Sequence, residues 1–149
     1  MKVSECMTRD VTVANPNDTL QKAASQMAEL DAGVLPVGDN DRLVGMLTDR
    51  DITVRAVAKG KGPQTPVRDV MSDEVKYCYE DEELATVTEN MGDIQVRRLP
   101  VLNRDKRLVG IVSLGDIVNT NRNARQAGQA LAGISKPGGE HSQTAEAKP

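Results

Sequence analysis

The length and composition of the chain allow a small globular protein and disfavour several functions. Its 149 residues are 38% apolar, which suits one compact domain or two very small ones that share a core. There are two tyrosines and no phenylalanine or tryptophan, so the core must consist of aliphatic residues and methionine. The formal charge of −3, with neither a basic stripe nor aromatic stacking platforms, disfavours nucleic-acid binding.

Neither a membrane span nor a leader is indicated. No apolar run approaches the length of about 18 residues that a transmembrane helix needs. The first residues, MKVSECMTRD, lack the apolar core of a signal peptide, so we expect a cytoplasmic protein. The spacing of Cys6 and Cys78 fits neither a disulfide framework nor a zinc site, and we expect two free thiols.

The most informative feature is an internal duplication. When the chain is shifted by 64 positions, Leu35-Pro36-Val37 falls on Leu99-Pro100-Val101. After a gap of one residue, Leu43-Val44-Gly45 falls on Leu108-Val109-Gly110. We therefore divide the chain into a first repeat over 3–60, a linker over 61–66, a second repeat over 67–122 and a polar tail over 123–149. We expect this tail to be disordered beyond about residue 133.

Within the first repeat, the elements follow in the order strand, helix, strand, strand, helix. A strand at Val11–Val13 leads into a turn, after which Asp18 is the expected helix N-cap and Gln21 completes a capping box. Apolar residues then recur at helical spacing up to Leu30. Two strands follow at about 34–37 and 43–47, and a helix starts near residue 51.

The second repeat shows the same order, with a helical stripe from Leu84 to Ile94. An acidic run at 80–83 precedes that stripe, where the helix dipole favours acids. A three-stranded unit cannot bury its sheet face alone, so two such units are expected to pack together. Residues 119–132 are a further candidate helix, which would pack on the repeats or on a partner.

One loop motif, Gly-x-x-[Thr/Ser]-x-x-Asp, occurs at the same place in both repeats, over Gly45–Asp51 and Gly110–Asp116. In each, an apolar strand ends in a hydroxyl residue, and an aspartate follows three positions later at the start of a helix. The hydroxyl suits a phosphate, and the aspartate suits both hydroxyls of a ribose. A single copy would be explained better by an ordinary helix cap. The repetition favours a ligand site, and the two roles are compatible.

These repeated segments, GVLPVGDNDRLVGMLTDRDI and QVRRLPVLNRDKRLVGIVSLGDI, resemble the CBS domain family, in particular stand-alone bacterial members that include proteins of the hypoxic-response type. The resemblance implies an α+β fold in which tandem CBS repeats, each β-α-β-β-α, pack sheet to sheet with pseudo-twofold symmetry. It also implies a Bateman module: a regulatory homodimer that catalyses nothing and requires no cofactor. AMP, ADP, ATP or an NAD-like nucleotide would bind as a regulatory ligand in the clefts between the repeats.

The family pattern implies that each site combines the hydroxyl and aspartate of one repeat with strand residues of the other. Site one is expected to contain several cations and site two almost none, so phosphorylated nucleotides should fill site one first. The residues assigned to site one are Thr48, Arg50, Asp51, Val75, Lys76, Arg97 and Arg98; those assigned to site two are Thr12, Val13, Gly33, Val34, Ser113 and Asp116.

Two other functions compete with nucleotide binding. Catalysis is disfavoured because the only histidine, His141, lies in the polar tail and no Ser-His or Cys-His arrangement is visible. Gly60-Lys61-Gly62-Pro63 lacks the frame of a phosphate-binding loop. The second alternative is a protein–protein interaction or dimerisation module without a ligand, in which the motif residues serve as caps. In either non-catalytic case we expect a regulated protein partner of unknown identity.

Overall fold

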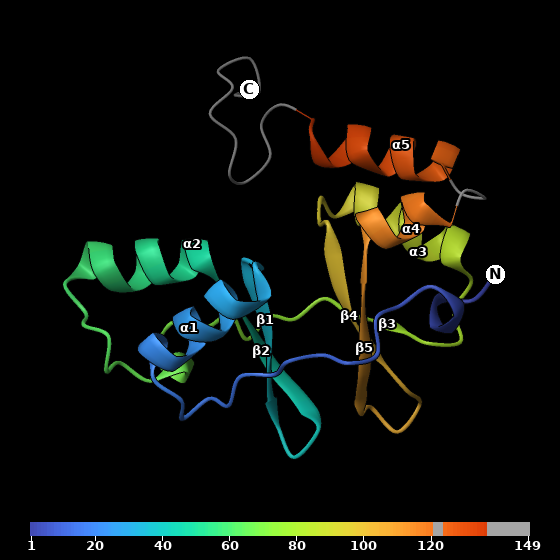
Figure 1. Cartoon of the computed structure of the whole chain (residues 1–149). Coiled ribbons are helices and arrows are strands. Elements are labelled where there is room, and N and C mark those ends of the chain that lie inside the picture. Colours follow the sequence, from blue (N-terminus) through green and yellow to red (C-terminus); the bar gives the residue numbers. More distant parts are fainter. Residues whose placement is uncertain (121–123, 137–149) are drawn as a thin grey trace. The chain divides into compact units, whose positions relative to one another are not determined.

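The computed structural model describes residues 1–120 and 124–136, so most of the tail predicted to be disordered lies outside the described residues. The chain divides into two compact units (Figure 1). Unit 1 contains residues 1–9, 77–104 and 109 onward, and unit 2 contains residues 10–76 and 105–108.

Unit 2 contains most of the first repeat. Helix α1 (Leu20–Leu30) precedes the antiparallel strands β1 (Val34–Asp39) and β2 (Arg42–Thr48). Helix α2 (Asp49–Asp51) continues through one wider π-helical stretch and a final 3₁₀ turn to Lys59. The buried core consists of aliphatic residues and one methionine: Ala14, Leu20, Ala23, Met27, Leu35, Val37, Leu47, Ala56, Val67 and Val70.

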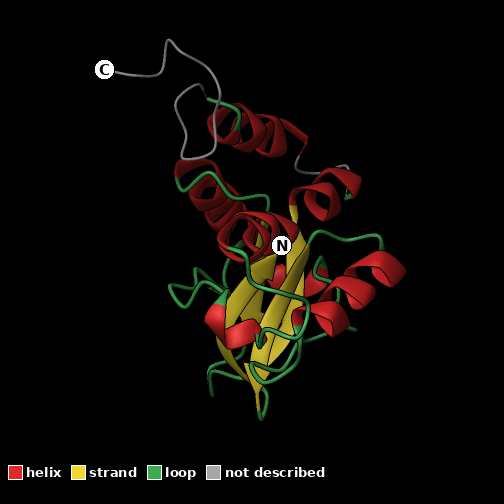
Figure 2. Cartoon of the chain, turned by 90° about the vertical axis from the view of Figure 1, so that its left-hand side faces the viewer, coloured by secondary structure: helices red, strands yellow, loops and turns green. Residues whose placement is uncertain are grey.

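Unit 1 contains most of the second repeat. Its sheet has the order β3 (Cys78–Tyr79), β4 (Arg98–Leu102) and β5 (Leu108–Ser113), with β3 and β4 parallel. Its helices are α3 (Leu84–Asp93), α4 (Leu114–Asn119) and α5 (Ala124–Ile134). Figure 2 shows the strands in yellow and the helices in red. Unit 1 shows the predicted order of strand, helix, strand, strand and helix, and unit 2 shows the same order without its first strand.

The compact units do not coincide with the sequence repeats, because each repeat lends its N-terminal residues to the other unit. Val3 and Met7 pack in the core of unit 1, whereas Val67 and Val70 pack in the core of unit 2. Backbone hydrogen bonds fix these segments: Thr8 pairs with Ile111, and the analogous pair in unit 2 joins Ser72 to Met46. The two repeats therefore exchange equivalent segments.

In the residues that precede α1, the local structure differs from the sequence prediction. The predicted strand at Val11–Val13 is reduced to a single parallel bridge between Ala14 and Val37. Asp18 is not the N-cap, because its carboxylate accepts a hydrogen bond from the backbone N–H of Asn15 at 2.9 Å and closes the preceding turn. Thr19 caps the helix instead, accepting the backbone N–H of Lys22 at 3.1 Å.

Helix α5 confirms the candidate helix predicted over 119–132, although its bounds are shifted toward the C-terminus. It lies over α3 and α4 (Figure 1). The approach to α3 is close, since a Cβ on Gly92 would lie 3.0 Å from the Cα of Ala130, and a Cβ on Gly133 would lie 2.7 Å from the carbonyl oxygen of Gly92. Ala130 is 2% exposed, so α5 is part of the core of unit 1.

We expect Gly45→Ala and Gly110→Ala each to destabilise the protein by about 1–3 kcal/mol. A Cβ at Gly45 would lie 2.9 Å from the backbone oxygen of Ser72, and one at Gly110 would lie 2.8 Å from that of Thr8. Both oxygens belong to the exchanged segments, whose backbone pairing prevents them from moving away. Chemical denaturation measures the loss. Gly62→Ala is the matched control, because nothing lies within 4 Å of that position and its stability should be unchanged. Equal stability of all three variants would contradict the proposed close packing.

Candidate ligand-binding loops

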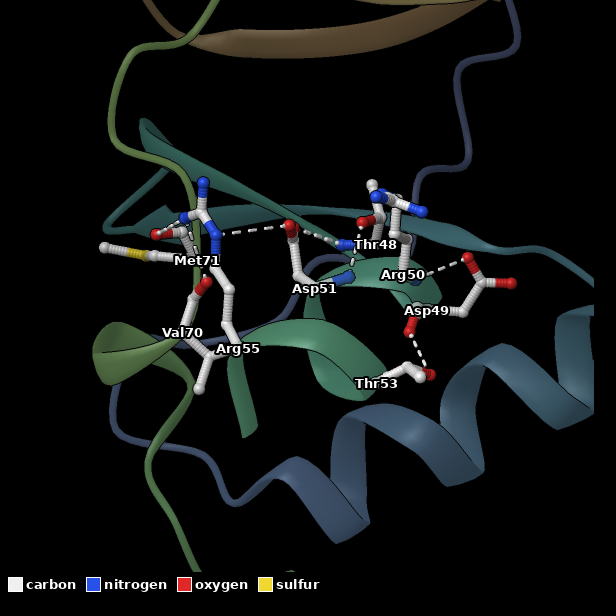
Figure 3. Close-up of polar contacts among 8 residues, drawn as sticks. All are labelled: Thr48, Asp49, Arg50, Asp51, Thr53, Arg55, Val70 and Met71. Carbon is white, nitrogen blue, oxygen red and sulfur yellow. Dashed lines mark hydrogen bonds and ion pairs between the residues drawn. The ribbon is translucent and has the colours of Figure 1, made fainter. Parts of the chain in front are cut away.

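The Thr48 loop begins where β2 ends and α2 starts. The hydroxyl of Thr48 accepts the backbone N–H of Asp51 at 3.0 Å, and the carboxylate oxygen Oδ2 of Asp51 accepts the backbone N–H of Thr48 at 2.9 Å. Thr48 has an extended backbone with φ −113° and ψ 159°, which turns its side chain toward the first helical turn (Figure 3). The pair forms a capping box that uses aspartate in place of the more common glutamate.

The Ser113 loop, between β5 and α4, repeats this geometry. Ser113 accepts the backbone N–H of Asp116 at 3.0 Å, and Oδ2 of Asp116 accepts the backbone N–H of Ser113 at 3.0 Å. The backbone angles of Ser113, φ −118° and ψ 159°, match those of Thr48. The two motif copies therefore fold to one local structure.

Each loop keeps polar capacity that the capping box does not use. The hydroxyls of Thr48 and Ser113 each retain a proton to donate, and each aspartate retains a second carboxylate oxygen. Within the described part of the chain, Oδ1 of Asp116 accepts no hydrogen bond. Oδ1 of Asp51 faces the Nε of Arg55, at 3.8 Å. All four loop side chains are half-buried. Each loop could therefore donate one hydrogen bond to a ligand and accept one or two from it.

Strand pairing places several of the other predicted residues beside the loop of their own repeat. Gly33 and Val34, assigned to site two, lie beside the Thr48 loop: Val34 pairs with Thr48, and the carbonyl of Gly33 accepts the N–H of Asp49 at 2.9 Å. Thr12 and Val13 precede the bridge to β1 and belong to the same unit.

The two arginines are likewise placed beside the other loop. The carbonyl of Arg97 accepts the N–H of Leu114 at 2.9 Å, next to Ser113, and Arg98 begins β4, the neighbour of β5. Within each repeat, the strand entered at Leu-Pro-Val pairs with the strand that ends in the hydroxyl residue. The predicted grouping of these arginines with Thr48 joins residues of two units and stays a prediction.

Val75 and Lys76 precede β3 in sequence and belong to unit 2. Among the described residues, they make no backbone hydrogen bond to either loop. Their membership of a site stays a prediction.

Charged groups are distributed unequally between the loops. The side chains of Arg50, Arg97 and Arg98 are exposed and have no hydrogen-bond or ion-pair partner within residues 1–120 and 124–136. Arg55, which the sequence analysis missed, lies one turn after Asp51, and its Nη1 donates to the carbonyls of Val70 and Met71 at 3.4 Å (Figure 3). The i, i+4 spacing of Asp51 and Arg55 was the available signal.

The cysteines are free, as predicted, and both belong to unit 1. Burial raises the pKa of Cys6, and the nearby carboxylate of Asp116 adds to the rise. Burial, with a smaller contribution from Glu82, raises the pKa of Cys78 from 9.0 to about 12. Both thiols are therefore protonated at neutral pH.

Neither a metal site nor a membrane span is found in the described ranges. Over residues 1–120 and 124–136, no group of three or more His, Cys, Asp or Glu side chains is placed to hold a metal ion. No helix in those ranges is long and apolar enough to cross a bilayer. His141 lies outside the described residues.

Comparison with known proteins gives one consistent family. The profile described as "CBS domain" matches residues 3–57 and again residues 67–122. The CBS domain-containing protein YhcV of Bacillus subtilis is 42% identical over 133 residues, which are 89% of this chain and 94% of that protein.

Two solved structures are also similar. Hypoxic Response Protein I, a name carried by a Mycobacterium tuberculosis relative, was solved with two coordinated zinc ions and is 38% identical with a TM-score of 0.72. The match covers 80% of this chain and 98% of that one. The CBS domain pair of protein MJ0100, in complex with 5′-methylthioadenosine and S-adenosyl-L-methionine, is 26% identical with a TM-score of 0.71. That match covers 83% of this chain and 98% of the other.

We expect Cys78 of the native protein to react slowly with a disulfide reagent at pH 8. A pKa of about 12 instead of 9.0 leaves roughly a thousandfold less thiolate, and only the thiolate reacts. Because the folded-state pKa is raised, the stabilising effect of the protonated thiol is complete below pH 9 and is lost as the pH rises toward 12. Labelling kinetics of the parent and of Cys78→Ala identify the slow thiol. Equal rates for Cys78 in the native and the denatured chain would contradict the assignment.

Proposed function

The chain belongs to the CBS domain family, with two repeats in tandem, and on that premise we propose that it is a regulatory module that binds adenine nucleotides and catalyses no reaction. AMP, ADP, ATP and NAD-like molecules share the adenosine unit that such a site would recognise. The duplicated hydroxyl–aspartate loop is the observation that carries the proposal. Its spare hydroxyl proton suits a phosphate oxygen, and its spare carboxylate oxygen suits the hydroxyls of a ribose.

The MJ0100 relative supports an adenosyl ligand. Both molecules in that complex contain adenine and ribose, whereas neither contains a phosphate. An adenosyl ligand needs a group that accepts hydrogen bonds from its ribose hydroxyls. Asp51 and Asp116 each offer one carboxylate oxygen for this purpose. The loops favour binding over catalysis because the hydroxyls of Thr48 and Ser113 accept backbone N–H groups, and the neighbouring carboxylates of Asp51 and Asp116 take part in the same capping boxes.

A ligand-free interaction module is the second candidate function. The capping boxes favour it, because their reciprocal hydrogen bonds satisfy both loops without any ligand. The regulated protein partner and a cytoplasmic location also remain proposals. Pull-down with tagged protein and cell fractionation would test them.

Thermal melting with a panel of nucleotides separates the two candidates. A ligand present at about 100 times its Kd adds about 2.7 kcal/mol to the free energy of unfolding, so an adenine nucleotide should raise the Tm by several degrees. Guanosine nucleotides at equal concentration are the control for non-specific anion binding. If no adenine compound changes the Tm and calorimetry detects no binding, only the interaction module remains as a candidate function.

We also propose that the protein is a homodimer. Leu30, Val54 and Val57, on α1 and on the helical stretch that follows α2, are 48%, 41% and 66% exposed, and a second copy of the chain would cover them. Light scattering at high micromolar concentration should give twice the mass of 16.1 kDa. Val54→Glu with Val57→Glu should shift the mass toward the monomer, whereas the neighbouring exposed change Lys59→Glu should not. A monomeric parent protein would contradict the proposal.

A further inference from the structure

Helix α5 lies outside both repeats. The family profile ends at residue 122, and α5 begins at Ala124. Residues 60–69, at the equivalent place after the first repeat, form turns and a single 3₁₀ turn at Val67–Asp69. In unit 1, α5 packs on α3 and α4 (Figure 1). The helix is therefore an addition to the second repeat and not one of the elements that the repeats share.

The attachment of α5 to unit 1 is shallow. Of the α5 side chains that the structure describes, Ala130 alone is buried, whereas Gly133 and Ile134 are half-buried. One side-chain hydrogen bond adds to this contact, from Nε2 of Gln95 to the carbonyl of Gly133 at 3.1 Å. Hydrophobic stabilisation grows with the apolar area removed from water, and alanine and glycine have little of it to bury. A surface with larger apolar side chains could therefore displace α5.

The surface that α5 covers is the C-terminal part of α3 and the residue that follows it. The two helices cross at Gly92, where a Cβ would lie 3.0 Å from the Cα of Ala130. Ile94 is half-buried and packs against the core cluster that contains Ala130. We call the surface of Gly92 and Ile94 the α3 face.

The first repeat contains the same surface without a cover. The shift of 64 positions that aligns the repeats places Gly92 on Ala28. It also places Ile94 on Leu30. Ala28 is exposed, and Leu30 is 48% exposed. Both repeats therefore have an apolar side chain at the end of the first helix, and only the second repeat has a helix that shields it.

The exposed copy of this surface belongs to the face proposed above for the dimer, which contains Leu30, Val54 and Val57. In an isologous dimer one face pairs with the same face of a second copy, so a single face of this kind produces a dimer and no larger assembly. A second face of the same kind on the same chain would bind further copies.

We propose that α5 is an intramolecular cover, which occupies the α3 face and prevents a second copy of the chain from docking there. The inference rests on the proposed dimer. A second copy is the expected occupant of the uncovered α3 face, because the duplicated surface in unit 2 is the one assigned to self-association. Displacement of α5 therefore raises the number of copies in the assembly.

Light scattering on the full chain tests the cover with a matched pair of glycine substitutions in α5. Gly133→Gln should prevent α5 from docking, because a Cβ at Gly133 would lie 2.7 Å from the carbonyl oxygen of Gly92. Its mass should rise to about twice that of the parent, since a second self-pairing face is then open. Gly128→Gln is the control and should keep the parent mass, because nothing lies within 4 Å of Gly128.

A second substitution checks that the larger species forms through the α3 face. Ile94→Glu, added to Gly133→Gln, should restore the parent mass because it places a charge on the uncovered surface. Both tyrosines of the chain belong to unit 1 and there is no tryptophan, so tyrosine fluorescence reports whether unit 1 is folded. If Gly133→Gln unfolds unit 1, the mass of the milder variant Gly133→Ala decides.

Three results overturn the cover. The first is a folded Gly133 variant with the parent mass, and the second is a larger species that Ile94→Glu does not reverse. The third is unfolding of unit 1 in both Gly133 variants, because α5 is then required for the fold.

The mass of the parent tests the proposed dimer separately. A dimeric parent whose mass neither Gly133 variant raises refutes the cover and leaves the dimer standing. A monomeric parent that Gly133→Gln converts to a dimer refutes the unit 2 face and supports the cover. If the parent and both variants are folded monomers, the dimer and the cover fail together.

Discussion

The reciprocal hydrogen bonds between a hydroxyl residue and the aspartate three positions later are the constraint on which both candidate sites depend. They hold Thr48 and Ser113 extended at the end of a strand and start the following helix in the same step. Because each bond uses only one carboxylate oxygen and one lone pair of the hydroxyl, the loop is rigid without a ligand and still has groups to offer one. Such preorganisation lowers the entropic cost of binding.

The exchange of N-terminal segments links that local motif to the tertiary structure. Met7 and Met71 come from the beginnings of the two repeats, and each packs against the glycine in the middle of a strand that leads to a hydroxyl–aspartate loop. Gly110 and Gly45 have no side chain, and this lets the exchanged backbone pair with the strand at close range. Each loop is thus supported by a segment from the other repeat, although the residues of the loop itself all belong to a single repeat.

Divergence between the repeats has left this scaffold intact while it changed the charge. Arg97 and Arg98 in one copy correspond to Gly33 and Val34 in the other, and Leu114 corresponds to Asp49. None of these changes touches the capping box, whose bond lengths agree to within 0.1 Å between copies. Electrostatics can therefore vary between the loops at little cost in stability, since surface charges contribute little to folding.

Residue types at fixed local spacing, such as Gly110, Ser113 and Asp116, were enough to predict the duplication, the loop motif and, apart from the strand at Val11–Val13, the order of elements. The sequence also predicted free thiols. The position of Arg97 beside Ser113, and the packing of Val3 and Val67 in the cores of the opposite repeats, followed from the folded structure alone. Strand partners are chosen by pairing and burial between segments distant in the chain, and no local pattern encodes them.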